Sequence, residues 1–438
     1  MSNYFGTDGI RGIAGEDLTA RMAFALGNAL CRQQKGVSVV VGRDNRVSSN
    51  MLFLGLASGI TAGGGNVIDG GILPTPAVSY FVKRYNADYG VVISASHNPA
   101  QYNGLKVFNS YGNKLAREEE LKLEKVFDDT LHSHTLECGN FKQLSYRQRM
   151  QYLKFLEKCT TMQLHGKKIV VDCANGVASF FAPQIFKKLG AEVIAIHTEK
   201  YGYSINENCG ALYPQDMQKT VLDTHADIGF CYDGDADRLI ACDENGQLLD
   251  GDKLLYMFAL RYQQEGKLGN HLVIGTAHTN TAIVLQLAKK NITVLRADIG
   301  DKYVAEMMRK YHAVLGGEQS GHLILADYIS TGDGILASVK IAELLQNGPI
   351  SKQANIELMP QYNLTVKVRD KVRILGRESV QLAIENANKQ VERIVVRASG
   401  TEDVIRIFSE AIEWQVAKKT AENVRDTIIM EDKECAEL

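Results

Sequence analysis

The stretch Val91–Phe108, VVISASHNPAQYNGLKVF, sets the pattern for the rest of the chain. Its apolar start predicts a buried strand, which ends where small and polar residues lead up to Pro99. The Asn-Gly turn signal further along predicts a second short strand. A serine on a tight turn past a strand is well placed to face a cleft, because loops carry chemistry on a rigid scaffold. One loop therefore offers a hydroxyl, an imidazole and an ammonium group, from Ser96, His97 and Lys106; a polar turn between two core strands is the alternative.

Length and composition limit the class of protein. A chain of 438 residues predicts roughly three or four domains, and a hydrophobic content of 45% is ordinary for globular protein. The formal net charge of -2 provides no global basic field, so we expect neither nucleic acid nor membrane as a partner. The eight cysteines show no CxxC or Cys/His metal spacing, which is typical of a reducing compartment. No signal peptide or spanning apolar run is evident, so we expect a cytoplasmic location.

Strands and helices alternate along most of the chain. Three junctions share the order apolar strand, small polar turn and helix start, namely VVVGRDNRVSS from Val39, IVVDCANGVAS from Ile169 and LVIGTAHTNTA from Leu272. This weak repetition favours three related α/β domains, although every strand–helix junction looks somewhat similar. Beyond 348–349 the pattern changes to that of a small α+β unit.

The predicted fold class is therefore α/β: three related α/β domains with mixed sheets and a smaller C-terminal α+β domain, arranged around a central cleft. We expect domain boundaries at 1–148, 149–250, 251–353 and 354–438. The stretch 138–147 shows little periodicity and is interpreted as a linker, followed by a helix at 149–159.

A second chemical stretch, DGDADR, places carboxylates at alternate positions, Asp233, Asp235 and Asp237. Three converging carboxylates repel one another unless a cation neutralises them, and oxygen-only ligands favour Mg²⁺. An EF-hand loop is the sharpest alternative, since its twelfth position is Glu244. However, its sixth position is Arg238 rather than glycine, and its flanks read as strands. Arg238 could pair with these carboxylates or meet a bound anion; an unliganded acidic turn is the remaining alternative.

A third loop, LGGEQSGH at 315–322, has glycines that free Glu318, Ser320 and His322 to point at a ligand. A carboxylate with a hydroxyl suits the hydroxyls or amine of a sugar, whereas a decorated glycine-rich turn is the plain alternative.

A fourth loop, RASGTE at 397–402, combines a guanidinium with hydroxyls and glycine-freed backbone N–H groups, and Arg406 lies on the following strand. That combination suits a phosphate monoester, although an ordinary hairpin turn is as compatible. A Walker loop is excluded because GxxxxGK[ST] is absent. A Ser/His/Asp hydrolase is disfavoured because no GxSxG elbow is present, and because His97 follows Ser96 too closely to serve easily as its base.

Taken together and in this order, SASHNP, DGDADR, GGEQSGH and RASGTE resemble the loops of the α-D-phosphohexomutase superfamily. FGTDGIRG, GRDNRVSS, NGLK, DCANG and STGDG match as well, so the resemblance covers nearly the whole chain. The Glu-Gln-Ser form of the sugar loop resembles the members that act on glucosamine phosphates. One departure is Asp403, which stands where the family usually has proline and adds a carboxylate near a phosphate site.

The resemblance implies an isomerase-class phosphotransferase that interconverts glucosamine 6-phosphate and glucosamine 1-phosphate, feeding UDP-N-acetylglucosamine and cell-wall synthesis. It implies a phosphoserine at Ser96, a glucosamine 1,6-bisphosphate intermediate that turns end over end, and one Mg²⁺ held by Asp233, Asp235, Asp237 and the Ser96 phosphate. The implied substrate-binding residues are Arg238, Glu318, Ser320, Arg397, Ser399, Gly400, Thr401 and Arg406. For proton transfer, the sequence leaves open Lys106, Arg11 and His322.

Two other functional classes remain open. One is a related mutase acting on glucose or mannose phosphates, and the other is a non-catalytic sugar-phosphate sensor with the same fold. A homodimer is compatible with the sequence, which does not fix the oligomeric state.

Overall fold

The computed structural model describes residues 4–6, 8–32, 34–127, 138–399 and 403–434. The chain divides into two compact units. The first contains Met1–Thr276 and Ala297–Asn355, and the second contains Ala277–Arg296 and Ile356–Leu438. The segment 277–296 is thus part of the second unit, and the domain boundaries expected from the sequence stay predictions.

The first sheet of the first unit has six strands in the order β1-β5-β4-β2-β3-β6. Their bounds are Ile10–Ile13 (β1), Ser38–Arg43 (β2), Asn66–Ile72 (β3), Tyr89–Ile93 (β4), Tyr102–Asn109 (β5) and Phe141–Gln143 (β6). Strand β2 runs parallel to β3 and β4, whereas β4 and β5 are antiparallel, with Val92 opposite Lys106. The sheet is thus mixed. The Ser96 loop connects its antiparallel strands β4 and β5, and Lys106 lies on β5.

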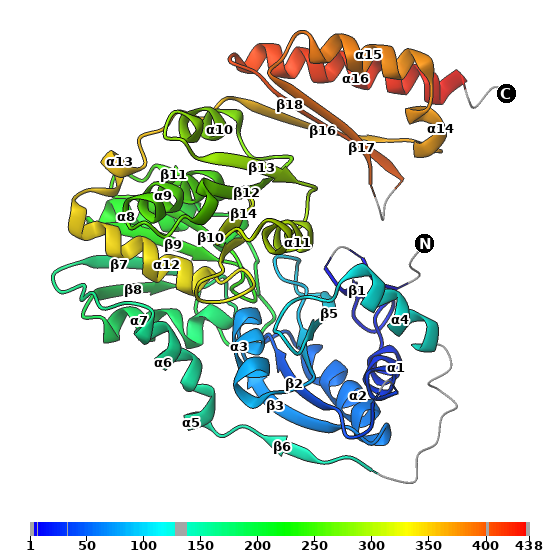
Figure 1. Cartoon of the computed structure of the whole chain (residues 1–438), viewed down its shortest axis with the longest axis vertical. Helices are drawn as coiled ribbons and strands as arrows, with labels where there is room; N and C mark the ends of the chain where they lie inside the picture. The colour runs from blue at the N-terminus through cyan, green and yellow to red at the C-terminus, as the bar shows by residue number, and fades with distance from the viewer. Residues whose placement is uncertain (1–3, 7, 33, 128–137, 400–402, 435–438) are drawn as a thin grey trace. The chain divides into compact units, whose positions relative to one another are not determined.

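Helices cover both faces of this sheet, with α1 and α2 on one face and α3 on the other (Figure 1). The helices are Ala20–Cys31 (α1), Ser49–Ala62 (α2), Thr75–Tyr85 (α3) and Arg117–Phe127 (α4). Val39 and Val91 pack in the core cluster shared with α1 and α2. On the opposite face, Gly42 and Gly90 leave room for valines of α3, since an added Cβ would meet Val78 within 3.0 Å at both positions. Burial on both faces explains the continuous valine runs.

The interpretation of 138–147 as a linker is wrong. This segment contains β6, which pairs with β3 at the edge of the sheet, and the start of α5 (Tyr146–Arg149). All three side chains of β6 are exposed, so the edge strand shows no apolar alternation. Ser145 and Gln148 form a capping box that begins α5, and α6 follows at Gln151–Lys158.

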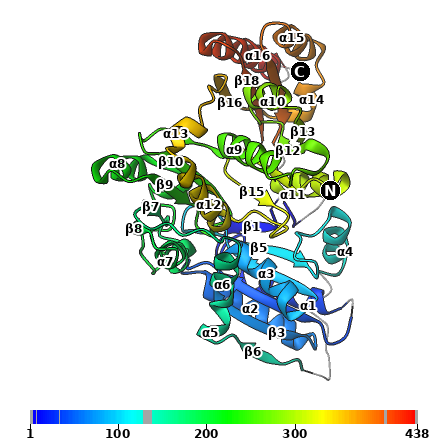
Figure 2. The ribbon, with the colours of Figure 1, turned by 60° about the vertical axis from the view of Figure 1, so that its left-hand side comes forward.

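The next sheet has five strands in the order β11-β10-β9-β7-β8. Their bounds are Lys168–Asp172 (β7), Glu192–Ile196 (β8), Ile228–Tyr232 (β9), Leu239–Asp243 (β10) and Leu248–Leu249 (β11), with helices Ala182–Lys188 (α7) and Gln215–Thr224 (α8). Figure 2 shows α8 beside β9 and β10. Because β9 and β10 are antiparallel, the acidic loop 233–238 joins two strands, which excludes the helix–loop–helix of an EF-hand.

The rest of the first unit supplies the sugar loop. Its elements are Gly251–Gln264 (α9), Leu272–Thr276 (β12), Asp301–Tyr311 (α11), Leu315–Gly317 (β14), Leu323–Leu325 (β15), Gly334–Ala342 (α12) and Ile350–Gln353 (α13). Strand β14 runs parallel to β12 and antiparallel to β15. The residues 318–322 therefore form the hairpin connection between β14 and β15.

The second unit is built on a three-stranded antiparallel sheet in the order β16-β18-β17. Its elements are Thr281–Ala288 (α10), Thr293–Ala297 (β13, up to Arg296), Gln361–Lys367 (β16), Lys371–Leu375 (α14), Glu378–Asn388 (α15), Arg393–Ala398 (β17), Val404–Glu410 (β18) and Trp414–Glu434 (α16). Val366 and Ile407 pack with Val380 of α15 and Val424 of α16 in one core.

Within the described residues, no helix is both long enough and apolar enough to cross a membrane.

Candidate active site

Ser96 lies directly after β4 in a strained and tightly held loop. Its φ of 53° is in the left-handed region, which costs a non-glycine residue about 1–2 kcal/mol. The guanidinium of the buried Arg46 donates to the carbonyl oxygens of Ser96 (2.9 Å) and Asn98 (2.7 Å), and the amide of Asn206 donates to the same two (2.9 and 3.0 Å). The Ser94 hydroxyl accepts the N–H of Ser96 at 2.9 Å. Neither Arg46 nor Asn206 was singled out from the sequence.

The acidic loop meets this serine. Ser96 Oγ donates to Asp233 Oδ2 at 2.5 Å, and Thr75 Oγ1 donates to Asp235 Oδ2 at 2.5 Å. Asp233, Asp235 and Asp237 are all buried, and each offers a carboxylate oxygen within 4.8 Å of the others. Within the part of the chain that the structure describes, Oδ1 of Asp235 and Oδ1 of Asp237 are buried without a hydrogen-bond partner. The carboxylates thus converge with unused lone pairs.

The pKa shifts of these carboxylates indicate that the cluster requires a positive charge. Burial, with the charges of Asp237 and Asp235, raises the pKa of Asp233 well above its ordinary value. Burial also acts to raise the pKa of Asp237, but Lys106 and His322 more than offset it and hold that pKa well below its ordinary value. Buried carboxylates with unpaired oxygens are the donor set of a hard divalent cation, so these residues fit Mg²⁺.

Lys106 lies in the middle of the carboxylates. Its Nζ is 2.7 Å from Asp235 Oδ2 and 3.3 Å from both Asp237 Oδ2 and Asp8 Oδ2. Burial opposes the charge of this ammonium, but the three carboxylates prevail and raise the pKa of Lys106 well above its ordinary value. The carboxylates therefore favour the charged form of Lys106, which can donate hydrogen bonds to an anion.

Other charged residues surround the same point. Arg11 and Lys114 both pair with Asp8, and Lys114 also pairs with Asp301. His322 faces Asp237 through Nδ1 at 3.7 Å, while its Nε2 accepts the backbone N–H of Gly332 at 3.1 Å. That backbone contact assigns the ring proton of a neutral His322 to Nδ1.

His97 lies closer to Ser96 than its sequence position had led us to expect. Its Nδ1 is 3.4 Å from Ser96 Oγ. Burial, Arg238 and Arg11 lower the pKa of His97 to about 3, so its ring is neutral at ordinary pH.

The sugar loop contributes one buried and one exposed candidate. Glu318 is buried, its Oε1 accepts the N–H of Gly300 at 3.1 Å, and burial with Asp301 raises its pKa. Ser320 is exposed. The Arg238 guanidinium interacts electrostatically with Asp233, Asp237 and Glu318, so it lies between the acidic loop and the sugar loop.

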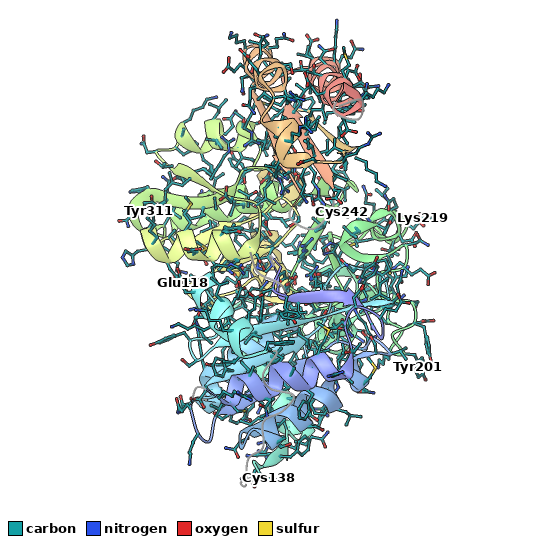
Figure 3. The ribbon with its side chains drawn as sticks, turned by 90° about the vertical axis from the view of Figure 1, so that its right-hand side faces the viewer. Glu118, Cys138, Tyr201, Lys219, Cys242 and Tyr311 are labelled. Atoms are coloured by element: carbon teal, nitrogen blue, oxygen red, sulfur yellow. The ribbon has the colours of Figure 1, made fainter. Side chains whose placement is uncertain are left out.

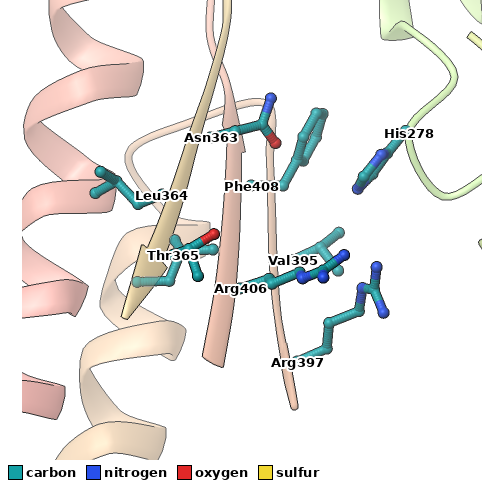
Figure 4. A pocket seen from close by; sticks show the side chains of 9 residues that line it. His278, Asn363, Leu364, Thr365, Val395, Arg397, Arg406 and Phe408 are labelled. Carbon is teal, nitrogen blue, oxygen red and sulfur yellow. The ribbon is translucent and has the colours of Figure 1, made fainter. Parts of the chain in front are cut away.

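The second unit contains a separate cationic cavity of about 230 Å³. Arg397 and Arg406 are directly opposite each other on β17 and β18, and Figure 4 shows both pointing into this cavity with His278. The His278 ring stacks on Phe408 with centroids 4.7 Å apart and planes at 15°. Burial and the neighbouring arginines lower the pKa of His278 to about 4. Paired guanidiniums on one face of a sheet suit a phosphate.

The sequence had not pointed to His278 as a functional residue. Of the phosphate loop itself, Ser399 is buried and donates its backbone N–H to Val404 O at 2.9 Å, while Gly400 and Thr401 lie outside the described residues. Asp403 is exposed and lies 3.6 Å from Lys371 Nζ, which neutralises part of its charge.

The predicted site residues thus fall into two groups, each described within its own unit. The first unit brings together Arg11, Ser96, Lys106, Asp233, Asp235, Asp237, Arg238, Glu318 and His322. The second unit brings Arg397 and Arg406 together at one cavity.

Comparison with known proteins agrees with this architecture. Family models described as phosphoglucomutase/phosphomannomutase alpha/beta/alpha domains I, II and III match residues 2–133, 150–246 and 250–362. The chain is 40% identical to phosphoglucosamine mutase of Clostridioides difficile, covering 98% of this chain and 99% of that protein. It is 39% identical to phosphoglucosamine mutase of Carboxydothermus hydrogenoformans, and the match covers 99% of this chain and 100% of that protein.

Solved structures confirm the predicted fold class. A phosphoglucomutase/phosphomannomutase family protein from Burkholderia thailandensis has a TM-score of 0.81 at 25% identity, covering 98% of each chain. Aspergillus fumigatus N-acetylphosphoglucosamine mutase, in complex with GlcNAc-6P and magnesium, has a TM-score of 0.67 at 17% identity, and the match covers 98% of this chain and 96% of that chain. At this identity the likeness supports the fold alone. From its loops, its domains and its full-length relatives, the chain belongs to the α-D-phosphohexomutase superfamily.

Proposed function

We propose that this chain interconverts glucosamine 6-phosphate and glucosamine 1-phosphate by passing a phosphoryl group between Ser96 and the sugar. The observation that carries the proposal is the 2.5 Å hydrogen bond from Ser96 Oγ to Asp233 Oδ2, inside a buried cluster of carboxylates and cations. Phosphoryl transfer requires in-line positioning and charge stabilisation more than covalent help from the protein. The names of the full-length relatives support glucosamine as the sugar.

Asp233, Asp235, Asp237 and a phosphate on Ser96 would hold one Mg²⁺ per chain. When bound, the ion supplies positive charge to the phosphoryl oxygens.

The protein's own residues position the transferring group. The hydroxyl proton of Ser96 is directed at Asp233 Oδ2, which leaves the lone pairs of Oγ for the incoming phosphorus. The ammonium of Lys106, held by Asp235 and Asp237, and the guanidinium of Arg238 stabilise the charge on the phosphoryl oxygens. As the bond from Ser96 Oγ to phosphorus breaks, one forms to the substrate hydroxyl oxygen, and that hydroxyl releases its proton. Lys106, Arg11 or His322 remains the predicted acceptor of this proton, and the sequence does not choose among the three.

The substrate's other phosphate has its own predicted binding residues. Arg397, Ser399, Gly400, Thr401 and Arg406 would hold the non-reacting phosphate, and Glu318 and Ser320 would bind the sugar. The intermediate is then glucosamine 1,6-bisphosphate, which must turn end over end so that its second phosphate returns to Ser96. A single reactive serine and a single phosphate-binding loop suffice for a substrate with two phosphorylated ends.

Substrate competition tests the sugar assignment. The protein is supplied with Mg²⁺ and equal glucosamine, glucose and mannose 6-phosphates, each with its matching bisphosphate, and each 1-phosphate is followed by phosphorus NMR. We expect the highest kcat/KM for glucosamine 6-phosphate. A higher kcat/KM for glucose or mannose 6-phosphate would replace the proposal with a phosphoglucomutase or phosphomannomutase, and no turnover of any sugar would favour a non-catalytic binding protein.

A further inference from the structure

A second cluster of potential metal ligands lies in the first unit, formed by Asp172, His197 and Cys209. Asp172 ends β7, His197 directly follows β8, and Cys209 precedes a 3₁₀ turn at Gly210–Leu212. Their ligand atoms, a carboxylate oxygen, a ring nitrogen and a sulfur, lie within 4.8 Å of one another. Asp172 and Cys209 are almost completely buried, whereas His197 is partly exposed. None of the three belongs to the proposed Mg²⁺ site.

His197 lies between two carboxylates. Its Nδ1 is 3.0 Å from Asp172 Oδ2, without the geometry of a hydrogen bond to any described residue, and its Nε2 is 3.3 Å from Asp216 Oδ2. Asp172 and Asp216 together raise the pKa of His197, so a metal ion bound here would displace a proton from the ring. The Asp172 carboxylate accepts backbone N–H groups from Ala174 (2.9 Å) and Gly210 (3.0 Å), which fix its orientation. Two ligands of one tetrahedral zinc ion, each about 2.0–2.1 Å from the metal, lie about 3.3 Å apart without a proton between them. The spacing of Asp172 and His197 is close to that.

We propose that Asp172, His197 and Cys209 form a second metal site, selective for a thiophilic divalent cation of the zinc class. Sulfur and imidazole donors suit Zn²⁺ or Co²⁺ and discriminate against Mg²⁺, which prefers oxygen. On binding, the S–H bond of Cys209 breaks, its proton goes to solvent, and a sulfur–metal bond forms. One thiolate and one carboxylate then balance the charge of the cation, and water takes the fourth position.

The proposed metal site lies at both ends of a segment that contacts the Ser96 loop. His197 and Cys209 bracket the segment 197–209, whose Tyr201 is exposed at the surface (Figure 3). The same segment carries Asn206, which donates to the carbonyl oxygen of Ser96 at 2.9 Å. A cation bound at both ends of this segment would restrain the backbone that supports the reactive serine.

Cobalt spectroscopy of the full chain tests the site without depending on turnover. Co²⁺ is titrated into protein saturated with Mg²⁺, and we expect a thiolate-to-cobalt charge-transfer band that saturates at one equivalent and is abolished by excess Zn²⁺. The band should be lost in Cys209→Ser and retained in Cys242→Ser, a matched control because Cys242 is also a buried cysteine of the first unit.

A second variant keeps the test decisive if Cys209→Ser fails to fold. His197→Gln changes a partly exposed side chain, and we expect it to weaken Co²⁺ binding at least tenfold while circular dichroism stays native. The absence of a thiolate band in the wild type would overturn the proposal, as would a band that persists unchanged in Cys209→Ser or His197→Gln.

Discussion

Ser96 Oγ donates a 2.5 Å hydrogen bond to Asp233 Oδ2, although 137 positions of sequence separate the two residues. Each lies on a loop that follows a buried strand, β4 or β9. The two loops are also in direct contact through their backbones, since a Cβ at Gly234 would lie 2.7 Å from Ser96 O. The reactive hydroxyl and the acidic cluster are therefore positioned as one assembly.

Arg46 is predicted to be essential for the geometry of the Ser96 loop. It pairs with Asp44 at 2.8 Å in a fully buried position and donates to several carbonyl oxygens of that loop. Arg46→Met leaves Asp44 as an unpaired buried charge, so we expect about 3–5 kcal/mol lower stability in denaturant unfolding and a lower kcat in the folded fraction. Arg21→Met, at an exposed position, is the control. An Arg46→Met protein with wild-type stability and kcat would contradict this role.

Gly234 is predicted to tolerate no side chain. Because a Cβ there would lie within 3 Å of Ser96 O and of the Ile205 and Asn206 side chains, Gly234→Ala must push the two loops apart. We expect about 1–3 kcal/mol of destabilisation and a fall in kcat larger than any change in KM. Gly269→Ala is the matched control, since nothing lies within 4 Å of its Cβ position. Equal kinetics for the two variants would argue against direct loop contact.

Asp235 is predicted to be a magnesium ligand. Its Oδ2 is used by Lys106 and Thr75, while Oδ1 is buried without a partner among the described residues. Asp235→Asn removes one negative charge at similar volume, so we expect calorimetric Mg²⁺ affinity to fall by more than about tenfold, together with activity. Asp223→Asn, at an exposed position, should bind Mg²⁺ normally. A chelator-resistant, active Asp235→Asn protein would contradict the metal assignment.

Asp333 is predicted to make stability depend on pH. It caps α12, accepting the N–H of Leu336 at 2.9 Å and the hydroxyl of Tyr152 at 2.8 Å, but burial raises its pKa from 3.8 to about 7. The folded state therefore keeps a proton that the unfolded state loses above pH 3.8. The stabilisation is complete below that pH and is lost as pH rises to about 7, with a slope of up to about 1.4 kcal/mol per pH unit.

Asp333→Asn tests this because its side chain carries no ionisable proton. Denaturant unfolding between pH 5 and pH 8 should show a smaller loss of stability in the variant than in the wild type, whereas Asp223→Asn should follow the wild type. Parallel pH profiles for Asp333→Asn and the wild type would show that Asp333 is not the titrating group.

The sequence predicts those parts of the fold and site that have a local signature. Valine runs mark the buried strands, and the alternate carboxylates of DGDADR mark the metal loop, because spacing along the chain determines both. Contacts made across the fold carry no such signature. Arg46 binds carbonyl oxygens about 50 positions away, and Asn206 reaches Ser96 across 110 positions. The sequence offers one indication of the role of Arg46, namely its position in the charged stretch GRDNR that follows a predicted strand.

An exposed edge strand and the residues that line a cavity formed by distant segments are equally hard to predict from the sequence. Strand β6 is exposed on both faces, so backbone pairing with β3 and not side-chain pattern defines it. His278 is brought to Arg397 and Arg406 only by the folding of the second unit, in which residues 277–296 and the C-terminal region belong to one compact unit. Its local sequence, GTAHTN, contains no feature that indicates an anion site.

The most direct test of the central claim is the phosphorylation state of Ser96. Protein with Mg²⁺ is incubated with glucosamine 1,6-bisphosphate, and intact-mass and peptide-mapping spectrometry follow the phosphoryl group before and after glucosamine 6-phosphate is added. We predict one phosphoryl group, located on Ser96 and lost to the sugar on chase, with no phosphorylation and no turnover in Ser96→Ala. A wild-type protein phosphorylated at another residue, or near-normal turnover in Ser96→Ala, would contradict the account.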